Sequence, residues 1–319
     1  MLLMASATGC TSYSKQRQND GATSGHFKMA CDESFQNVLD QEIDIFEYQY
    51  PKATVLCRYM SETAALDSLM KGKVNLIVTS QDLTEKQRMI LKDQKRSSRS
   101  RVIAVDAVAL IVNKDCDIDE LDLDDLRDLF SGKCRKWGQL VPTKMRNDSI
   151  KLLFDGHAGG VIHYIRNKFL GGKDFPIPVY SAYSSEEVFQ KVEKSRNAIG
   201  LVGVSWVADD MGASKQDVKQ RVAVLNAQQT DPTAISFKKR VKVLKVRPKD
   251  KLMGVQPYQA YINDGSYPLF RKIYAIDAAP LGSVAHSFFV FLTSTIGQKI
   301  ILQTGVMPAA EPVRTVQLQ

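Results

Sequence analysis

The sequence predicts an α/β protein made of two compact lobes. Its 319 residues are enough to bury two hydrophobic cores. Three strand-to-helix units follow one another between residues 27 and 84, an order typical of a parallel sheet covered by helices. A long apolar stretch, residues 102–113, then leads into a second series of strands and helices. A strand of this length can run from one lobe into the next.

The first lobe is predicted to consist of the three strand-to-helix units. Each strand is a short apolar run, and each helix begins next to Ser, Thr or Asp, which are the preferred residues for capping a helix N-terminus. The predicted strands cover residues 27–31, 54–59 and 74–79, and the helices begin at Asp32 or Ser34, at Ser61 and after Thr84. The carboxyl ends of these parallel strands meet at one edge of the sheet, where ligands bind.

The second lobe is predicted to lie between two crossing strands, which is a hinge architecture. Its helices cover residues 122–130, the segment from 159 onward and 184–192, and its strands cover 150–154, 178–181, 197–203, 241–246 and 260–262. Residues 209–233 are polar and predict a loop. The second crossing strand covers residues 267–276, and helices over 286–292 and 295–303 and a strand over 313–318 follow. The predicted division is 1–25 for a leader and tether, 26–107 and 267–319 for the first lobe, and 108–266 for the second.

The segment of residues 151–169 combines a strand, a tight loop and a helix. Asp155-Gly156 is a turn signal, and apolar residues at helical spacing begin just after Gly159-Gly160. Because glycine has no side chain, a ligand can approach the first free N–H groups of this helix, where the helix dipole favours an anion. The alternative is a glycine-softened connection that binds nothing.

Side chains with hydroxyl or carboxyl groups gather at the carboxyl ends of the first-lobe strands. They are Ser34, Ser61, Thr63, Thr79, Ser80 and Asp82. Their shared edge indicates a polar ligand site, although helix caps and turns use the same residue types.

The amino-terminal residues resemble the end of a bacterial lipoprotein signal. Small residues, Ala7, Thr8 and Gly9, precede Cys10, and a polar stretch over residues 11–25 follows. In such signals the cysteine is lipidated and becomes the new amino terminus, with the polar stretch as a tether. The alternative is a disordered cytoplasmic leader with an incidental cysteine.

Four further cysteines are present: Cys31, Cys57, Cys116 and Cys134. In an exported protein an even number permits disulfides, and Cys31 and Cys57 lie on neighbouring predicted strands. All three pairings and four free thiols remain open. There is no CxxC motif and no Cys/His cluster, which argues against a zinc site.

The net charge of +8 derives partly from two segments rich in Lys and Arg, residues 86–101 and 238–251. Nucleic-acid binding would need this charge together with aromatic stacking or a helix that enters a groove, and neither is evident. The segments are predicted to be solvated faces that steer anions or lie near an anionic membrane. A content of 44% hydrophobic and 24% charged residues is ordinary for a soluble protein, and no apolar run is long enough to span a membrane.

The order of motifs from residue 27 onward resembles the phosphate-binding lipoproteins of bacterial ABC transporters. The motifs are Ser34-Phe35, residues 74–83 (VNLIVTSQDL), Asp155-Gly156, residues 197–203 (NAIGLVG), Tyr267-Pro268-Leu269, Gly297-Gln298-Lys299 and residues 305–308 (GVMP). The resemblance implies the type II periplasmic-binding fold, in which two lobes close over a dehydrated oxyanion. Backbone N–H groups, hydroxyls and often one carboxylate hold the anion in that family.

The resemblance also implies roles for particular residues. Ser34 and Phe35 match the first binding loop, and Ser61 or Thr63 matches the second. Asp82 approximately matches the acidic position that accepts the proton of hydrogen phosphate and so rejects sulfate. With the second-lobe loop, the candidate ligand-binding residues are Ser34, Phe35, Ser61, Thr63, Thr79, Ser80, Asp82, Asp155, His157, Gly159 and Gly160.

The second-lobe loop departs from the family pattern. The family continues with hydroxyl residues and usually has an arginine upstream, whereas this chain has residues 157–160 (HAGG) and apolar Leu152 and Leu153. His157 can replace the arginine only if it is protonated. Each lost charge-assisted hydrogen bond is worth roughly 1.5–3 kcal/mol, so these changes could weaken phosphate binding by orders of magnitude.

Two functions follow from these observations. The first is a periplasmic, lipid-anchored solute-binding protein that captures phosphate or a related oxyanion and delivers it to the membrane subunits of an ABC permease, without a cofactor. The second is a binding-fold lipoprotein that has lost the anion site and acts as a protein-interaction or sensory module.

An enzyme is the least favoured possibility. The sequence has no HExxH, GxSxG, GxGxxG or Walker motif, and its four histidines are far apart. Asp32, Asp82 and Asp155 could converge as acid/base groups, but a phosphatase would also need a metal or a nucleophile.

Overall fold

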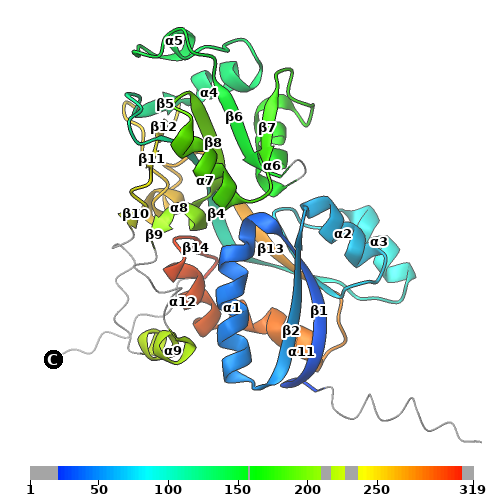
Figure 1. Cartoon of the computed structure of the whole chain (residues 1–319). Helices are drawn as coiled ribbons and strands as arrows, with labels where there is room; N and C mark the ends of the chain where they lie inside the picture. Colours follow the sequence, from blue (N-terminus) through cyan, green and yellow to red (C-terminus); the bar gives the residue numbers. More distant parts are fainter. Residues whose placement is uncertain (1–20, 157–158, 210–216, 227–235, 311–319) are drawn as a thin grey trace, which may run out of the picture.

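The computed structural model of the chain describes residues 21–156, 159–209, 217–226 and 236–310. Within them, two α/β lobes are joined by two long strands (Figure 1). The main sheet runs through both lobes in the strand order β2 (Lys52–Met60), β1 (Ser24–Asp32), β3 (Leu76–Thr79), β13 (Phe270–Asp277), β4 (Arg99–Asn113), β8 (Ala198–Gly203), β6 (Lys151–Asp155) and β7 (Val179–Ala182). The predicted α/β class with two crossing strands is confirmed.

The first lobe contains the three predicted strand-to-helix units. β1 pairs in parallel with both β2 and β3, which confirms the parallel sheet. Its elements are β1 (Ser24–Asp32), η1 (Glu33–Phe35), α1 (Gln36–Gln49), β2 (Lys52–Met60), α2 (Glu62–Met70), β3 (Leu76–Thr79) and α3 (Glu85–Asp93). Side chains of Asp32, Ser61 and Thr84 accept hydrogen bonds from the first turns of η1, α2 and α3, so the predicted caps are present.

The two crossing strands are β4 (Arg99–Asn113) and β13 (Phe270–Asp277), which pair antiparallel to each other. β4 changes partner between Ala107 and Val108, from β13 on the first-lobe side to β8 on the second-lobe side. Two short strands, β11 (Val241–Val243) and β14 (Met307–Pro308), also pair with β4. The lobe boundaries set out above remain a prediction.

The second lobe is built on three strands of the main sheet, β6 (Lys151–Asp155), β7 (Val179–Ala182) and β8 (Ala198–Gly203). β6 pairs in parallel with both neighbours. The helices of this lobe are α4 (Leu123–Phe130), α5 (Trp137–Leu140), α6 (Gly160–Leu170), α7 (Ser185–Lys194) and α8 (Val204–Val207). A two-stranded sheet of β5 (Glu120–Asp122) and β12 (Lys245–Arg247) lies outside the main sheet.

Three predictions for the second lobe are wrong in detail. The polar stretch 209–233 contains a helix, α9 (Val218–Asn226), whose Arg221 donates to the Asp44 carboxylate of α1 at 2.9 Å. The predicted strand over 260–262 is a helix, α10 (Gln259–Asn263). The prediction failed because three residues are too few to distinguish the apolar pattern of a strand from that of a helix. The predicted strand over 241–246 is interrupted at Leu244 and forms β11 and β12, which pair with different partners.

Several short elements were not predicted. They are β5, α5, α8, β14 and the two strands β9 (Ala208–Asp209) and β10 (Ser236–Phe237), which pair with each other. The carboxyl-terminal helices α11 (Val284–Phe291) and α12 (Thr295–Gln303) agree with the sequence prediction. The predicted strand over 313–318 and the lipidation candidate Cys10 lie outside the described residues.

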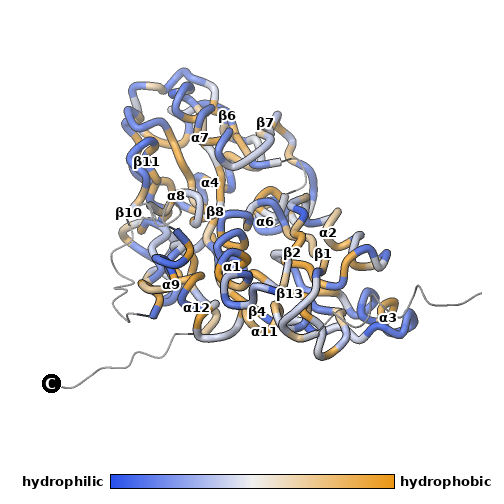
Figure 2. Tube along the Cα trace, turned by 60° about the horizontal axis from the view of Figure 1, so that its bottom comes forward, coloured by the Kyte–Doolittle hydropathy of each residue, from blue (hydrophilic) through white to orange (hydrophobic). Residues whose placement is uncertain are grey.

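The hydrophobic core follows the main sheet through both lobes, as the orange segments along the strands in Figure 2 indicate. In the first lobe, α11 and α12 return to cover the amino-terminal units. Phe46 of α1 packs edge-on against Phe288 and Phe291 of α11, with ring centroids 5.0 and 5.2 Å away. The first lobe is therefore assembled from both ends of the chain.

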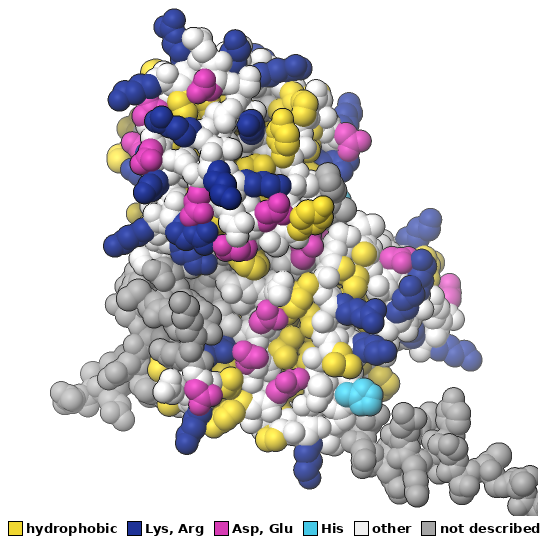
Figure 3. Space-filling model, in the orientation of Figure 1, with side chains coloured by type: hydrophobic (Ala, Val, Ile, Leu, Met, Phe, Trp, Pro, Cys, Tyr) yellow, Lys and Arg dark blue, Asp and Glu magenta, His cyan; other side chains and the backbone are white. Residues whose placement is uncertain are grey.

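The basic segments at 86–101 and 238–251 form several ion pairs with acidic residues. Arg88 pairs with Asp82, and Arg240 pairs with both Glu186 and Glu193. Lys and Arg side chains are spread over the face drawn in Figure 3, interspersed with Asp and Glu.

The four cysteines within the described residues, Cys31, Cys57, Cys116 and Cys134, are free thiols. Among those residues, no single helix is both long and apolar enough to cross a membrane. α11 and α12 are long and apolar enough only when taken together, and they are bent by 60° where they meet.

Candidate functional site

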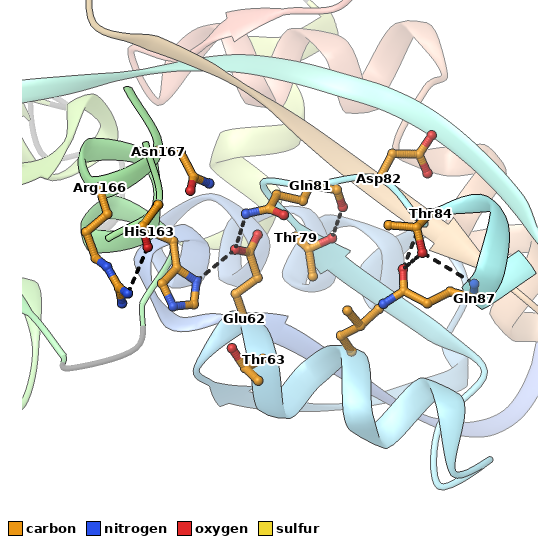
Figure 4. Close-up of a pocket in the computed structure, with 12 residues that line it drawn as sticks. Glu62, Thr63, Thr79, Gln81, Asp82, Thr84, Gln87, His163, Arg166 and Asn167 are labelled. Atoms are coloured by element: carbon orange, nitrogen blue, oxygen red, sulfur yellow. Dashed lines mark hydrogen bonds and ion pairs between the residues drawn. The ribbon is translucent and has the colours of Figure 1, made fainter. Parts of the chain in front are cut away.

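A cleft of about 360 Å³ lies where α2, α3 and the end of β3 face α6 of the second lobe (Figure 4). Polar side chains from both lobes line it: Glu62, Thr63, Thr79, Asp82, His163 and Arg166. The Glu62 carboxylate and the His163 ring point toward each other across the cleft. The cleft therefore lies at the predicted edge, beyond the carboxyl ends of the first-lobe strands.

Arg271 of β13 forms the centre of a buried polar network next to this cleft. Its Nε and Nη2 atoms donate to Asp106 Oδ2 at 3.0 and 2.9 Å, and Nη2 also donates to Ser34 Oγ at 2.9 Å. The guanidinium lies over the Phe35 ring, 4.5 Å from its centroid. Among the described residues, no atom accepts a hydrogen bond from Nη1.

The charges in this network shift one another's protonation. Burial alone would lower the pKa of Arg271, but the charges of Asp106 and Asp32 outweigh it and raise that pKa. Burial raises the pKa of Asp106, although Arg271 acts in the opposite direction. Asp106 Oδ1 also accepts from the N–H of Val204 at 3.1 Å, at the start of α8. The pair thus joins the two crossing strands to the second lobe.

Asp32, at the end of β1, accepts hydrogen bonds from both lobes. Its Oδ1 atom accepts from Ser34 N at 2.9 Å and from Ser34 Oγ at 2.5 Å. Its Oδ2 atom accepts from the N–H of Gly160 at 2.8 Å, in the first turn of α6. The helix N-terminus predicted to hold an anion therefore binds a carboxylate of the chain itself. Burial raises the pKa of Asp32, while Arg271 and Ser34 oppose the rise.

Glu62 of α2 makes a second such arrangement. Its Oε1 atom accepts from Ser80 N at 2.7 Å and from Ser80 Oγ at 2.6 Å. Its Oε2 atom is 3.4 Å from His163 Nδ1 of α6, across the cleft. Burial alone would raise the pKa of Glu62, but the hydrogen bonds of His163 and Ser80 and the charge of Arg271 lower it overall.

Asp155, at the end of β6, is fully buried. Its Oδ2 atom accepts from Ser185 Oγ at 2.7 Å, and Oδ1 has no hydrogen-bond donor among the described residues. Burial raises the pKa of Asp155 to about 7, and the nearby charges of Asp32 and Glu33 add to the rise. At neutral pH a large share of this carboxyl therefore carries a proton.

The structure brings some of the predicted residues together and separates others. Thr63, Thr79 and Asp82 line the cleft, while Ser34, Ser80, Asp155 and Gly160 belong to the buried networks beside it. The Phe35 ring lies under Arg271, and Ser61 Oγ caps α2. Gly159 precedes α6 as its cap residue, and His157 lies outside the described residues.

Asp82 and Thr79 already have partners at the cleft. Asp82 pairs with Arg88 at 2.6 Å and accepts from Leu83 N at 2.7 Å. Thr79 Oγ1 donates to the Gln81 carbonyl at 2.8 Å. Asp82 does not meet Asp32 and Asp155 in the buried network. Within the described part of the chain, no three His, Cys, Asp or Glu side chains are placed to hold a metal ion.

Sequence reasoning missed the roles of Arg271, Asp106 and Glu62. A signal existed for Asp106, because it is the one charged residue in the apolar stretch 102–112. Glu62 gave no signal, since an acidic residue in the first turn of a helix is ordinary helix chemistry.

We expect Gly156→Ala to destabilise the fold by about 1–3 kcal/mol. Gly156 has φ of +77°, and an added Cβ would be 2.2 Å from Glu33 Oε1. Gly171→Ala is the matched control, because its φ is +60° and nothing lies within 4 Å of the added Cβ. Urea unfolding of both variants separates the backbone cost from the displacement of Glu33. If Gly156→Ala and Gly171→Ala lower the free energy of unfolding equally, the displacement of Glu33 costs no stability.

Three comparisons with known proteins agree with this architecture. A family model described as the PBP superfamily domain matches residues 17–295. A phosphate-binding protein PstS of Pseudomonas aeruginosa is 21% identical over 305 residues, covering 91% of this chain and 85% of that protein. A PstS of Staphylococcus aureus is 23% identical over 171 residues, covering 53% of this chain and 50% of that protein.

Two solved structures share the fold at low sequence identity. One is a putative phosphate ABC transporter substrate-binding protein with bound phosphate from Clostridium perfringens. It has a TM-score of 0.69 and 18% identity, covering 90% of this chain and all of that one. The other is an ABC-type phosphate transport receptor from Vibrio cholerae. It has a TM-score of 0.63 and 18% identity, covering 89% of this chain and all of that one.

Proposed function

The chain belongs to the PBP superfamily, and we propose that it is an exported solute-binding protein that holds phosphate or a related oxyanion between its lobes. The names of the relatives support phosphate as the solute. The protein works by capture and release, without covalent chemistry or a cofactor, and passes the anion to the membrane subunits of an ABC permease.

The observation that carries this proposal is the position of Arg271. Its guanidinium is buried beside the start of α6, and Nη1 has no acceptor among the described residues. An added Cβ on Gly160 would lie 2.7 Å from Nη1 and 3.1 Å from Ser80 Oγ. A guanidinium, a hydroxyl and a helix N-terminus at one place are the donors that recognise an oxyanion.

The cellular location in this proposal is the periplasm, with the protein held on the envelope through lipidated Cys10. The support is the run of small residues before Cys10 and the polar stretch that follows it. The polar residues between Cys10 and the start of β1 at Ser24 are then the tether between the lipid and the binding domain.

Isothermal titration of the folded protein with phosphate, sulfate and molybdate tests the ligand. We expect saturable heat with phosphate and much weaker heat with sulfate. Hydrogen phosphate can donate its proton to a carboxylate near the bound anion, whereas sulfate carries no proton at neutral pH. Unfolding temperature measured in the same buffers provides an independent readout, since a bound ligand raises it. The absence of both signals with all three anions would refute the proposal.

One observation favours the second function, a binding-fold module without an anion site. The carboxylates of Asp32 and Glu62 already bind the N–H groups of Gly160 and Ser80. In that case the folded lobes present a surface to another protein of the envelope. Recovery of permease subunits from detergent-solubilised membranes would argue against this alternative.

A further inference from the structure

We infer that the carboxylates of Asp32 and Glu62 are built-in substitutes for an anionic ligand, which hold the lobes together and which an oxyanion must displace. The inference rests on the proposed function and deepens it, because it names the residues that decide whether an anion enters the site. Asp32 is the principal residue, since it lies deepest and has the shorter contact between the lobes.

The Asp32 contact joins the lobes in the way a bound anion would. One carboxylate oxygen binds Ser34 on the first lobe, and the other binds the Gly160 N–H at 2.8 Å on the second. Asp32 is fully buried, so water does not compete for these hydrogen bonds. Charge-assisted hydrogen bonds to a helix N-terminus are the contacts that a free oxyanion would otherwise make.

No room remains for an anion beside Asp32 in this arrangement. A Cβ added to Gly160 would be 3.0 Å from Asp32 Oδ2 and 2.7 Å from Arg271 Nη1. If a single carbon atom does not fit there, a four-oxygen anion does not fit either. Binding therefore requires the Asp32 carboxylate to move away from Gly160, which breaks one contact between the lobes.

Glu62 repeats the arrangement at the end of the neighbouring strand. It takes both donors of Ser80, and its other oxygen faces His163 of the second lobe at 3.4 Å. The Glu62 side chain is only 6% exposed. The donors of Ser34, after β1, and of Ser80, after β3, are thus bound by carboxylates of the chain at the place where the lobes meet.

The balance of charges around Arg271 also indicates that an oxyanion must displace one of these carboxylates. Arg271 is already bound to Asp106, and Asp32, Glu62 and Asp155 lie close enough to affect its network. An incoming phosphate would add negative charge where carboxylates outnumber the guanidinium. Removing Asp32 frees the Gly160 N–H and Ser34 and also removes one like charge.

The experiment compares the full chain with Asp32→Ala and Asp32→Asn by phosphate titration and small-angle X-ray scattering. We expect the Kd for phosphate to fall at least tenfold in Asp32→Ala. Without phosphate, the radius of gyration should increase relative to wild type, and phosphate should restore it. Asp32→Asn keeps one acceptor oxygen, so its Kd for phosphate and its radius of gyration should lie between those of wild type and Asp32→Ala. Asp67→Asn, an exposed change on α2, is the control and should match wild type in both measurements.

The two readouts separate this inference from the proposed function. If no variant binds phosphate but Asp32→Ala is more open, Asp32 does hold the lobes together and phosphate capture fails. If wild type binds phosphate as tightly as Asp32→Ala and both have the same radius of gyration, the inference is wrong and phosphate capture stands. Circular dichroism verifies folding, and Glu62→Gln repeats both measurements if Asp32→Ala does not fold.

Discussion

Arg271→Met should lower the free energy of unfolding by about 3–5 kcal/mol, because it leaves the buried Asp106 carboxylate without its cation. The Arg271 and Asp106 side chains are 2% and 1% exposed, so water cannot replace the lost partner. Ser34 Oγ also loses its donor, and the Phe35 ring loses the guanidinium stacked on it. Urea unfolding followed by far-UV circular dichroism measures the loss.

The double variant Arg271→Met/Asp106→Asn provides the critical comparison. Neutralising Asp106 removes the unpaired charge, so the double variant should recover a large part of the stability lost by Arg271→Met alone. Arg127→Met is the control, because its ion pair with Asp124 is exposed and should change stability by less than about 1 kcal/mol. A double variant no more stable than Arg271→Met would contradict this account of the pair.

Asp155→Asn should stabilise the protein at pH 8 and have little effect at pH 4. The pKa of Asp155 is about 7 in the folded protein, against an ordinary value of 3.8. Between these values the folded protein keeps a proton that the unfolded chain has lost, so the free energy of unfolding falls as pH rises through this window. The difference of about 3 pH units corresponds to about 4 kcal/mol as an upper limit. The asparagine amide cannot ionise, so the variant should escape this loss.

Unfolding curves at several pH values between 4 and 8 test this prediction. The difference between Asp155→Asn and wild type should grow with pH and level off near pH 8. Asp67→Asn serves as the exposed control and should follow wild type across the range. A constant difference between Asp155→Asn and wild type at all pH values would mean that Asp155 titrates normally.

Most of the fold could be predicted because its signals are local. Short apolar runs followed by capping residues identified β1, β2 and β3 with their helices, and the length of the stretch 102–113 identified β4 as a crossing strand. The errors occurred where the pattern was short or polar. α10 has five residues, and α9 lies in a polar stretch where hydrophobic periodicity is weak.

The site could be predicted only in part. Ser34, Ser80 and Gly160 lie where the two lobes meet, because strand ends and helix starts determine their places. The partners of these donors could not be foreseen, since Asp32 and Gly160 are 128 positions apart in sequence. Local sequence patterns show where hydrogen-bond donors occur, but they do not show which acceptor each donor binds.

The way β13 closes the first lobe has a consequence for how the exported chain folds as it emerges amino terminus first. β1, β2 and β3 emerge early, but β3 pairs with β13, which emerges only after the entire second lobe. Until then the β3 edge is an open template for non-native strand pairing, and the faces later covered by α11 lack their helix. The inserted lobe, whose strands β6, β7 and β8 are close in sequence, has the shorter route to completion. A chain that has emerged only as far as residue 270 would therefore carry a finished second lobe and an unfinished first one.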